Sequence, residues 1–548
     1  MILRTIGGRP RFCHVARKPS GSEEGSHVQI EELARQRFGF TGLRAGQLRA
    51  VEAAVAGRDV LAVLPTGSGK SAIYELAGMM RDGPTVVVSP LIALQDDQLA
   101  HLRAAGLTAI VLNSHQSSRE HAAALAASCG PDAFVFLSPE QLAKPETRDV
   151  LRRARPGLFA VDEAHLISQW GRDFRTDYMR LGAQADALGV PVRMALTATA
   201  APPIRAEISR RLGLRDPEVV VGDFDRPHIQ LAARRVQTVR DKHHELEQAA
   251  AELDGPGIVY AATHAAAQDA HDVLAASGHS VALYHAGLTP RVRREAMASY
   301  LDGSARIISA TVAFGMGIDK PDVRWVLHVD PPASLDAYYQ EFGRAGRDGD
   351  AAVARLVYRV EDFGAAAHFS PGGVSRAAVA RVAELVASGA EVAPTRETTA
   401  ALVRLADLGA AAWDADGRVR WTGDWTVDRA LAASTAETRR ENEVSRSQLE
   451  MMRRYAEHGG CRRSFMLTYF GQDYPGPCGN CDNDLAGAVA PITASEPYPV
   501  GGRVRSERWG DGTVQRYDGD QMTVLFDDHG YRDLSVPITL ERRLLRGL

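Results

Sequence analysis

The sequence predicts an α/β protein with two parallel β-sheets, and two patterns carry this prediction. From Val28 to about Gly222, short apolar runs such as DVLAVL, TVVVSP and LFAVDEAH alternate with helical stretches, as expected for βαβ units around a parallel sheet. A second series, including GIVYAAT, ARIISAT and VRWVLHVD, starts near Phe224. The chain therefore contains two α/β lobes, and its 548 residues leave room for further small domains.

Composition excludes several classes of protein. Hydrophobic residues make up 45% and charged residues 24% of the chain, which rules out a disordered or collagen-like protein. No apolar run approaches the roughly 18 residues that span a bilayer, and residues 1–20 lack the apolar core of a signal peptide. We therefore expect a cytoplasmic protein with no membrane partner. The net charge of −4 means that any nucleic-acid surface is local, and arginine must supply it because only five residues are lysines.

After about residue 370 the pattern changes to smaller segments. Two expected helices and the run DGRVRWTGDWTV, interpreted as a hairpin with a glycine turn, resemble a winged helix, although such a hairpin also serves as plain scaffold. A helical segment then leads into three clustered cysteines, and a proline-containing linker precedes short β-runs typical of a small barrel. The expected units are a flexible leader at 1–26, a first lobe at 27–222, a second lobe at 223–370, a winged-helix-like segment at 371–435, a cysteine module at 436–490 and a barrel at 498–548.

The run LAVLPTGSGKS has the character of a phosphate-binding loop. It lies between an expected strand and helix, where backbone N–H groups and the helix N-terminus face phosphates. Lys70 is expected to reach the outer phosphates and Ser71 a magnesium ion. The strict pattern has a further glycine where this chain has Leu64, so the motif alone leaves a scaffold turn as an alternative. The expected nucleotide contacts are Gly67, Ser68, Gly69, Lys70 and Ser71.

A pair of acids follows an apolar strand in GLFAVDEAH. Asp162 and Glu163 are then expected at the carboxyl edge of the sheet, where open α/β sheets bind ligands. Asp162 suits a magnesium ion, a hard cation that prefers oxygen ligands, and Glu163 suits the general base that activates an attacking water. The alternative is a strand that ends in two solvated acids, and the phosphate-loop pattern upstream favours the site.

These motifs, in order over residues 36 to 350, resemble those of the RecQ family of superfamily 2 helicases. RFGFTGLRAGQ resembles the family's adenine-reading motif, PTGSGKS its motif I, SPLIALQDDQ motif Ia, VDEAH motif II and LTATA motif III. FDRPHI, GIVYAATH and YHAGL resemble the start of the second lobe, and ATVAFGMGIDKPDVRWVLH resembles motif V. The resemblance implies two RecA-like lobes that bind ATP with magnesium, with further nucleotide contacts by Arg44, Gln47 and Asp319.

The run YYQEFGRAGRDG resembles motif VI, with Phe342 where the family usually has threonine. The resemblance implies that Gln340, Arg344 and Arg347 point into the cleft between the lobes. An arginine from a facing lobe stabilises the charge that develops on a transferred phosphate, so hydrolysis becomes sensitive to lobe closure. The spacing does not decide whether Arg344 or Arg347 is this arginine finger.

The segment after the acids, HLISQWGRDFRTDY, interleaves aromatic and basic residues. Aromatic rings stack on unpaired bases and arginines meet phosphates, but a spacing of four is also that of a core-facing helical stripe. RecQ-like helicases carry an aromatic-rich loop here that couples DNA contact to ATP hydrolysis, and the resemblance therefore favours DNA contact. The expected DNA-binding residues are Trp170, Arg172, Phe174 and Arg175.

Three cysteines form the pattern C-x16-C-x2-C, which suits a tetrahedral zinc site. CRR, YFG and PCGNCD resemble the family's zinc module, whose fourth cysteine would fall at Asp484. The expected zinc ligands are Cys461, Cys478, Cys481 and Asp484. An oxygen ligand makes such a site weaker than four thiolates, and the alternative is a relic with free thiols. The winged-helix-like segment precedes this module, whereas in the family the winged helix follows it. We therefore assign no duplex-binding residues to the hairpin from the resemblance.

The final run, VGGRVRSERWGDGTVQRYDGDQMTVLFDDHGYRDLSV, resembles the SH3/Tudor-like module at the C-terminus of UvrD/PcrA-type helicases. Residues 501–548 hold eight arginines and eight acidic residues, and this balance argues against a surface that tracks phosphates. The expected role is docking to a protein partner, such as RNA polymerase as the resemblance implies. A barrel that only stabilises the C-terminus is the alternative.

The leading hypothesis is an ATP-dependent DNA helicase that translocates 3′→5′ on single-stranded DNA and unwinds tailed or forked duplexes in repair and recombination, as the resemblance implies. Its location would be the bacterial cytoplasm, at the nucleoid. The alternative is an ATP-regulated adaptor or translocase that docks to a protein and unwinds weakly, because the family's duplex-binding domains are not evident. An RNA helicase is disfavoured because LTATA and QEFGRAGRDG resemble RecQ motifs.

Overall fold

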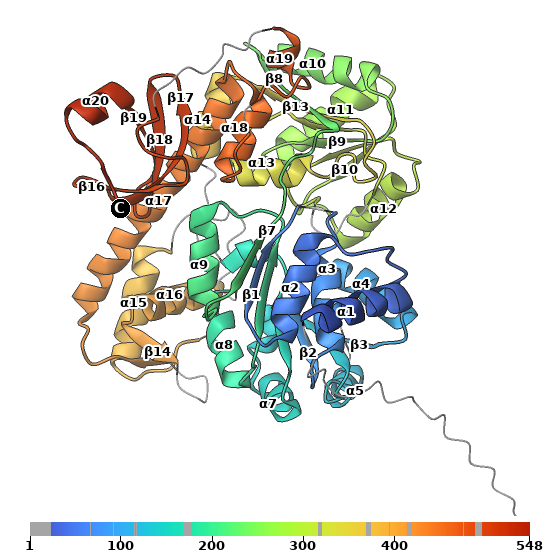
Figure 1. Cartoon of the computed structure of the whole chain (residues 1–548), viewed down its shortest axis with the longest axis vertical. Helices are drawn as coiled ribbons and strands as arrows, with labels where there is room; N and C mark the ends of the chain where they lie inside the picture. Colours follow the sequence, from blue (N-terminus) through green and yellow to red (C-terminus); the bar gives the residue numbers. More distant parts are fainter. Residues whose placement is uncertain are drawn as a thin grey trace, which may run out of the picture.

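The computed structural model consists of two α/β lobes with further helices and a small β-sheet along one side (Figure 1). Helix α1 (Glu23–Phe38) already begins at Glu23, so the flexible leader expected at 1–26 ends at least four residues earlier. The structure describes residues 23–548 apart from 66, 91, 114, 115, 117, 168–177, 316–319, 369–373, 394, 414–418, 475 and 488–495.

The first lobe is a seven-stranded parallel sheet in the order β3-β4-β2-β5-β6-β1-β7. Alternate residues of its inner strands enter two separate apolar clusters, one on each face, and continuous apolar runs are typical of such doubly covered sheets. The strands are β1 Val60–Val63, β2 Thr85–Val88, β3 Thr108–Leu112, β4 Ala133–Leu137, β5 Leu158–Val161, β6 Arg193–Thr197 and β7 Glu218–Val221. The covering helices after α1 are α2 Ala45–Val55, α3 Lys70–Met79, α4 Ile92–Ala104, α5 Ser118–Ala127, α6 Pro139–Leu142, α7 Pro145–Ala154, α8 Leu181–Leu188 and α9 Pro202–Leu212, with short 3-10 turns η1 Ala164–Ile167 and η2 Tyr178–Arg180.

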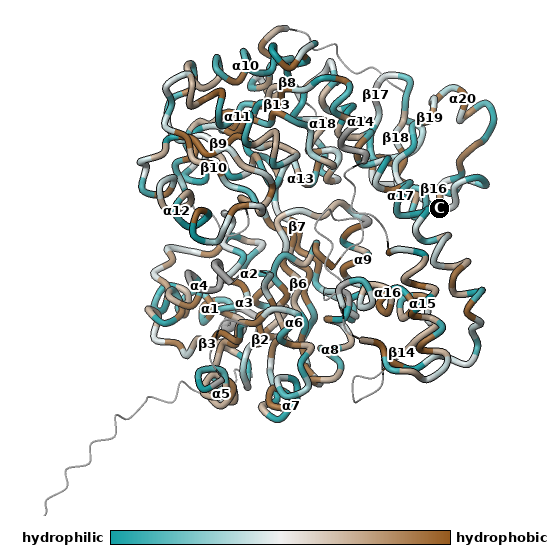
Figure 2. Tube along the Cα trace, turned by 180° about the vertical axis from the view of Figure 1, so that it is seen from behind, coloured by the Kyte–Doolittle hydropathy of each residue, from teal (hydrophilic) through white to brown (hydrophobic). Residues whose placement is uncertain are grey.

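The second lobe repeats the arrangement with six parallel strands in the order β10-β11-β9-β12-β13-β8. Both sheets run through the apolar centre of their lobes (Figure 2). The prediction of two RecA-like α/β lobes is therefore confirmed. The strands are β8 Ile229–Arg235, β9 Gly257–Tyr260, β10 Val281–Tyr284, β11 Ile307–Ala310, β12 Trp325–His328 and β13 Ala352–Tyr358, and the helices are α10 Val239–Glu252, α11 His264–Ala276, α12 Pro290–Leu301, α13 Leu335–Phe342 and α14 Val360–His368.

The winged-helix-like segment has the two expected helices, α15 (Arg376–Ala387) and α16 (Arg396–Asp407), but its hairpin differs from the expected one. Strand β14 (Ala411–Trp413) pairs with β15 (Val419–Trp421), so the hairpin starts upstream of DGRVRWTGDWTV. A turn leads from β15 into α17 (Val427–Glu457), and in it the Trp425 N–H donates to the carbonyl of Thr422. Helix α17 also runs across the expected boundary at 435, so the two neighbouring units share one helix.

The C-terminal sheet has five antiparallel strands in the order β19-β18-β17-β16-β20. It docks on α17 and on α18 (Arg462–Tyr469): Arg516 lies over the ring of Phe465 at 3.9 Å, and the rings of Tyr531 and Tyr469 stack at 5.5 Å. Its strands and helix are β16 Arg503–Ser506, β17 Gly510–Asp518, β18 Gln521–Phe526, β19 Gly530–Ser535, α20 Val536–Glu541 and β20 Arg546–Gly547. The expected β-runs are thus present, while the likeness to a Tudor module stays a prediction.

Helix α17 connects the two lobes along one side of the molecule (Figure 1). Arg404 of α16 forms a bidentate pair with Glu441 of α17 at 2.6 and 2.7 Å, and Asp407 accepts a hydrogen bond from Arg211 of α9 at 3.1 Å. At the other end of α17, Tyr455 is fully buried against Tyr338 of α13, with ring centroids 5.3 Å apart. With 31 residues, α17 reaches about 46 Å. None of the helices in the described part of the chain could cross a membrane.

The buried ion pair between α16 and α17 predicts a measurable cost when it is broken. The side chain of Arg404 is only 4% exposed, and Arg404→Met removes both of the charge-assisted hydrogen bonds that Glu441 accepts from it. We therefore expect the free energy of unfolding to fall by about 2–4 kcal/mol. The matched control is Arg381→Met, whose partner Glu397 is 54% exposed, and it should cost no more than about 0.5 kcal/mol. Chemical denaturation measures both, and equal costs would contradict the structure.

Candidate nucleotide site between the lobes and candidate zinc site

The phosphate-loop sequence forms a turn between β1 and α3. Gly67 and Gly69 have φ of +76° and +73°, left-handed values that glycine adopts without strain. Gly69 caps α3, and Lys70 is the first helical residue. The Lys70 Nζ donates to the carbonyl of Leu64 at 3.2 Å. Leu64, which replaces the glycine of the strict pattern, is buried in the first-lobe core, so this position contributes packing while its carbonyl holds the lysine.

Gln47 of α2 braces the phosphate loop. Its Nε2 donates to the carbonyls of Ser68 at 2.8 Å and Gly69 at 3.0 Å, and its Oε1 accepts from the backbone N–H of Arg44 at 2.8 Å. The adenine-reading motif therefore lies directly against the phosphate loop. Ser71, the expected magnesium ligand, accepts a hydrogen bond from Gln98 of α4 at 3.3 Å, which links motif Ia to motif I.

The acid pair lies at the carboxyl end of β5, as expected from the strand pattern. Asp162 accepts from the N–H of Glu163 at 2.9 Å, and Glu163 has a φ of +50°, an uncommon value for a residue with a side chain. The Nδ1 of His165 lies 3.3 Å from Glu163 Oε2 and 3.0 Å from Thr197 Oγ1. His165 thus connects the acid pair to the LTATA segment at the end of β6.

The charges in this site act strongly on one another because all of them are at least partly buried. Burial lowers the pKa of Lys70, although Glu163 and Asp162 oppose this. Burial and the charge of Glu163 raise the pKa of Asp162 to about 7. For Glu163, burial is opposed by His165, Lys70 and Arg344, which together hold its pKa at about 2.

Motif VI brings two arginines of the second lobe to this site. The side chain of Arg347 passes over the phosphate loop: a Cβ on Gly67 would lie 3.9 Å from its Cγ, and its charge lowers the pKa of Lys70. Arg344 is buried beside Gly315 and lowers the pKa of Glu163. Gln340 is half-buried on α13, the helix that leads to both arginines.

Several expected functional residues cannot be placed. Asp319 and the expected DNA-binding residues lie outside the residues that the structure describes, the latter being Trp170, Arg172, Phe174 and Arg175. Tyr178, the next aromatic of that segment, is fully buried in the core, so the core alternative holds for this one ring. Sequence reasoning did not single out His165 and Thr197, although both lie within quoted motifs and a histidine beside two acids was an available signal.

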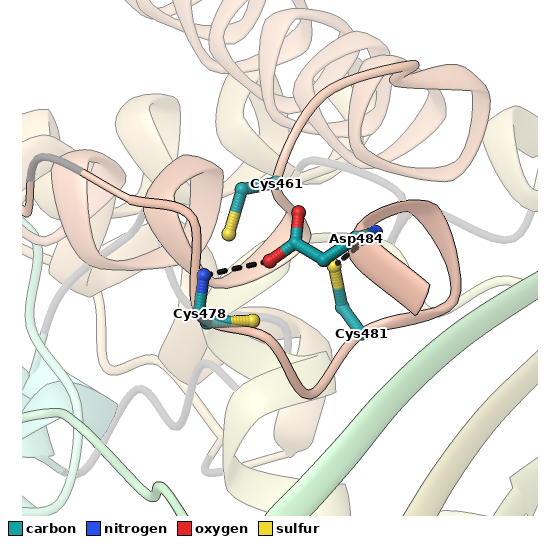
Figure 3. Close-up of side chains that lie close together, drawn as sticks. All are labelled: Cys461, Cys478, Cys481 and Asp484. Atoms are coloured by element: carbon teal, nitrogen blue, oxygen red, sulfur yellow. Dashed lines mark hydrogen bonds between the residues drawn. The ribbon is translucent and has the colours of Figure 1, made fainter. Parts of the chain in front are cut away.

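The three cysteines and Asp484 converge on one point beside β8 (Figure 3). Their candidate ligand atoms all lie within 4.8 Å of one another. Cys461 precedes α18, and Cys481 precedes α19 (Asp482–Leu485). One oxygen of Asp484 accepts from the N–H groups of Cys478 at 2.6 Å and Gly479 at 3.0 Å.

The donor set fits a zinc ion. The other carboxylate oxygen of Asp484, Oδ1, is buried without a hydrogen-bond partner, which is costly unless a cation or donor satisfies it. Three sulfur atoms and one oxygen within 4.8 Å of one another are the kind and number of donors that tetrahedral zinc sites in proteins use. The second oxygen is already held by backbone N–H groups, so the free one is fixed in orientation.

Comparisons with known protein families agree with this geometry. Residues 44–207 match the DEAD/DEAH box helicase family, residues 241–349 the helicase conserved C-terminal domain, and residues 422–485 the RecQ zinc-binding family. A phosphate loop and acid pair on one lobe, faced by arginines of a second lobe, together with these matches, define an ATP-dependent helicase of the two-lobed class.

Relatives narrow the class to a family. The chain is 37% identical to the probable ATP-dependent DNA helicase RecS of Bacillus subtilis, over 61% of this chain and 68% of that protein. It is 33% identical to the ATP-dependent DNA helicase RecQ of Synechocystis, over 84% of this chain and 98% of that protein. It is 32% identical to the ATP-dependent DNA helicase RecQ of Haemophilus influenzae, over 81% of this chain and 62% of that protein. The chain belongs to the RecQ family of DNA helicases.

Solved structures show the same fold. The helicase MrfA bound to DNA superposes with a TM-score of 0.52 at 17% identity, covering 74% of this chain and 63% of that one. The Mycobacterium smegmatis helicase Lhr bound to single-stranded DNA and AMP-PNP gives 0.51 at 19% identity, covering 76% and 62%. At these identities the likeness concerns the fold alone.

The Gln47 brace predicts the effect of a side chain in the phosphate loop. A Cβ on Gly69 would lie 2.7 Å from Gln47 Nε2, at a φ of +73°. Gly69→Ala should therefore lower the free energy of unfolding by about 1–3 kcal/mol, from backbone strain plus the displaced glutamine. Gly39→Ala is the control, because its φ of +69° carries the same strain with nothing within 4 Å of a Cβ. If thermal and chemical unfolding give equal losses for both variants, the brace contributes nothing.

Proposed function

We propose that this chain is an ATP-dependent DNA helicase that moves 3′→5′ along single-stranded DNA and separates duplexes during repair or recombination, at the nucleoid in the cytoplasm of a bacterium. The position of Arg347 carries the proposal. This side chain belongs to the second lobe and lies over the phosphate loop of the first. Any change in lobe separation therefore changes the distance between this cation and a bound phosphate, and hydrolysis is coupled to lobe movement.

The residues of the first lobe divide the work of hydrolysis. The loop 67–69 would cradle the phosphates through backbone N–H groups, and Lys70 would bind the outer phosphates. Ser71 and Asp162 offer the oxygen ligands that magnesium prefers, and the ion would supply charge neutralisation on the phosphates. Glu163 would accept the proton of the attacking water. The contact of His165 with Glu163 keeps that carboxylate charged and oriented.

We assign the arginine finger to Arg347. Its side chain is the one that crosses the phosphate loop beside Lys70, whereas Arg344 is buried beside Gly315 and acts on Glu163. A cation beside the outer phosphates stabilises the charge that develops there during transfer. Arg344 is then a positioning residue that lowers the pKa of Glu163, and Gln340 would contribute from α13, the helix that precedes both arginines.

For the DNA strand, we propose contacts by Trp170, Arg172, Phe174 and Arg175. Their segment follows η1 directly, and η1 begins one residue after Glu163. His165 within η1 is held by Thr197, so a strand bound to this segment would act on a turn that is anchored in the hydrolytic site. Stacking of unpaired bases on aromatic rings tolerates any sequence, as a translocating enzyme needs.

The zinc module is proposed to bind one zinc ion through Cys461, Cys478, Cys481 and Asp484. Its role is structural, because the module fastens to the second lobe. Arg463 donates to the carbonyl of Ile229 at 2.7 Å and pairs with Asp225. Four protein ligands would leave zinc no open position for catalysis.

A second candidate function is docking of a protein partner on the C-terminal sheet. The sheet buries Leu525 and Tyr531 against the rest of the molecule, but Ile538, Leu540 and Leu548 are 47%, 46% and 64% exposed. Exposed apolar side chains of this size are typical of interaction surfaces when they are grouped. If docking is the main function, the protein would still hydrolyse ATP but would separate DNA strands only weakly.

The helicase proposal predicts a strict dependence on Lys70. Purified protein should hydrolyse ATP faster with single-stranded DNA and should separate DNA duplexes that carry a 3′ single-stranded tail, in preference to RNA duplexes. Lys70→Ala should lower both rates by at least about 100-fold, because a buried phosphate-binding cation is lost. Lys144→Ala, at an exposed lysine outside the site, should leave both unchanged. DNA-stimulated hydrolysis without strand separation would favour the docking candidate instead.

The zinc proposal predicts opposite effects of two substitutions at Asp484. The protein should contain about one zinc per chain by elemental analysis. Asp484→Asn should release zinc to a chelator faster than the unaltered protein, because it removes the anionic ligand. Asp484→Cys should release it more slowly, because zinc favours sulfur. Asp473→Asn, at an exposed acid of the same module, is the control. A zinc content well below one per chain would refute the site.

A further inference from the structure

The end of α18 lies where both lobes and the zinc module meet. The ring of Phe470 stacks on Phe224 of the interlobe connection at 4.6 Å and meets Tyr339 of α13 edge-on at 5.0 Å. From the first lobe, Arg205 donates to the carbonyl of Phe470 at 3.0 Å. Phe470 is therefore fixed by contacts from three directions, and α18 cannot shift without disturbing the connection between the lobes.

Tyr469, the last residue of α18, reaches the motif VI helix. Its side chain is almost fully buried, and its hydroxyl donates to the carboxylate of Asp336 in the first turn of α13. A negative charge in the first turn of a helix is favoured by the helix dipole, but burial raises the pKa of Asp336. The hydroxyl of Tyr469 lowers that pKa and so supports the charged form.

The C-terminal sheet holds Tyr469 from the opposite side. The ring of Tyr531, on β19, stacks on Tyr469 with centroids 5.5 Å apart and an interplanar angle of 29°. Tyr531 is 7% exposed and belongs to the main core. Next to it, a Cβ on Gly530 would lie 2.2 Å from Ser447 Oγ of α17. The two contacts of Tyr469 place the end of α18 between the C-terminal sheet and α13 (Figure 1).

Phe342 belongs to an aromatic layer on α13 itself. It stands at the position where the family usually has threonine, and its ring packs edge-on against Tyr338 at 5.0 Å and Tyr339 at 5.3 Å. Phe342 is 2% exposed. The helix that carries motif VI is thus held by an aromatic layer along one side and by the Tyr469 hydrogen bond at its start.

We propose that Tyr469, clamped by Tyr531 of the C-terminal sheet, is a positioning residue that orients motif VI by its hydrogen bond to Asp336. This inference rests on the proposed ATP hydrolysis. The bond fixes the first turn of α13, and α13 leads directly to Arg344 and Arg347. The C-terminal sheet is then part of the hydrolytic machinery and not only an appendage. Neither tyrosine touches the nucleotide site, so the effect acts through the orientation of α13.

The decisive variant is Tyr469→Phe, which keeps the stacked ring and removes only the hydroxyl. DNA-stimulated kcat for ATP should fall about 3- to 10-fold, while KM for ATP stays within about twofold, because an arginine that engages in the transition state affects kcat. Affinity for single-stranded DNA should not change. The matched control is Tyr498→Phe, which removes a hydroxyl of the C-terminal sheet that donates to Leu545 instead, and its kcat should equal that of the unaltered protein.

A double-mutant cycle separates this role from general destabilisation. Asp336→Ala, which leaves no acceptor for the tyrosine hydroxyl, should lower kcat at least as much, and adding Tyr469→Phe to it should lower kcat little further, because both changes break the same hydrogen bond. Additive losses, or an unchanged kcat in Tyr469→Phe, would overturn the inference. Unfolding temperatures of all variants show whether lost folding explains lost kcat, and such an explanation would also overturn it. If the unaltered protein lacks DNA-stimulated hydrolysis, the proposed function fails instead.

Discussion

The structure depends on holding oppositely charged side chains from two separate sheets around one small buried space. Lys70 and Glu163 come from the first lobe, while Arg344 and Arg347 come from the second, and each changes the pKa of a neighbour. Buried charges are costly unless partners compensate them. Bringing the lobes together supplies these partners, so the electrostatics of the site are complete only when both lobes are in place.

The remaining units can be understood as supports for this arrangement. The zinc module fastens to β8 and the interlobe connection. Helix α17 extends from α16, which contacts α9 of the first lobe, to the core beside α13 of the second. The C-terminal sheet adds Tyr531 to the end of α18. An insertion of α15 and α16 before the zinc module, and not after it, gives α17 its second attachment, through the Arg404 pair with Glu441. This order of units therefore attaches α17 to both lobes.

Sequence motifs named most of the residues that the structure brings together at the candidate nucleotide site, because the chemistry of such a site constrains short runs of residues. The phosphate loop, the acid pair and motif VI were each predictable from local pattern, and so was the set of three cysteines with Asp484. The tertiary contacts of these residues were harder to predict from the sequence. Gln47 holds the phosphate loop through carbonyls that no side-chain pattern reveals, and the contact of Arg211 with Asp407 joins residues far apart in the chain. The hairpin starts earlier than expected, because Ala411–Trp413 forms a strand through its pairing with Val419–Trp421.

By itself, the sequence determined two parallel-sheet lobes, their order, the family and most chemical groups of the site, because alternating apolar runs and phosphate-binding turns depend on neighbouring residues. Only the tertiary structure decided which arginine lies over the phosphate loop, that His165 bridges Glu163 and Thr197, and that Tyr469 reaches Asp336. These relations depend on the packing of separate lobes and modules. Burial then sets the strength of each charge, and burial is a property of the assembled fold.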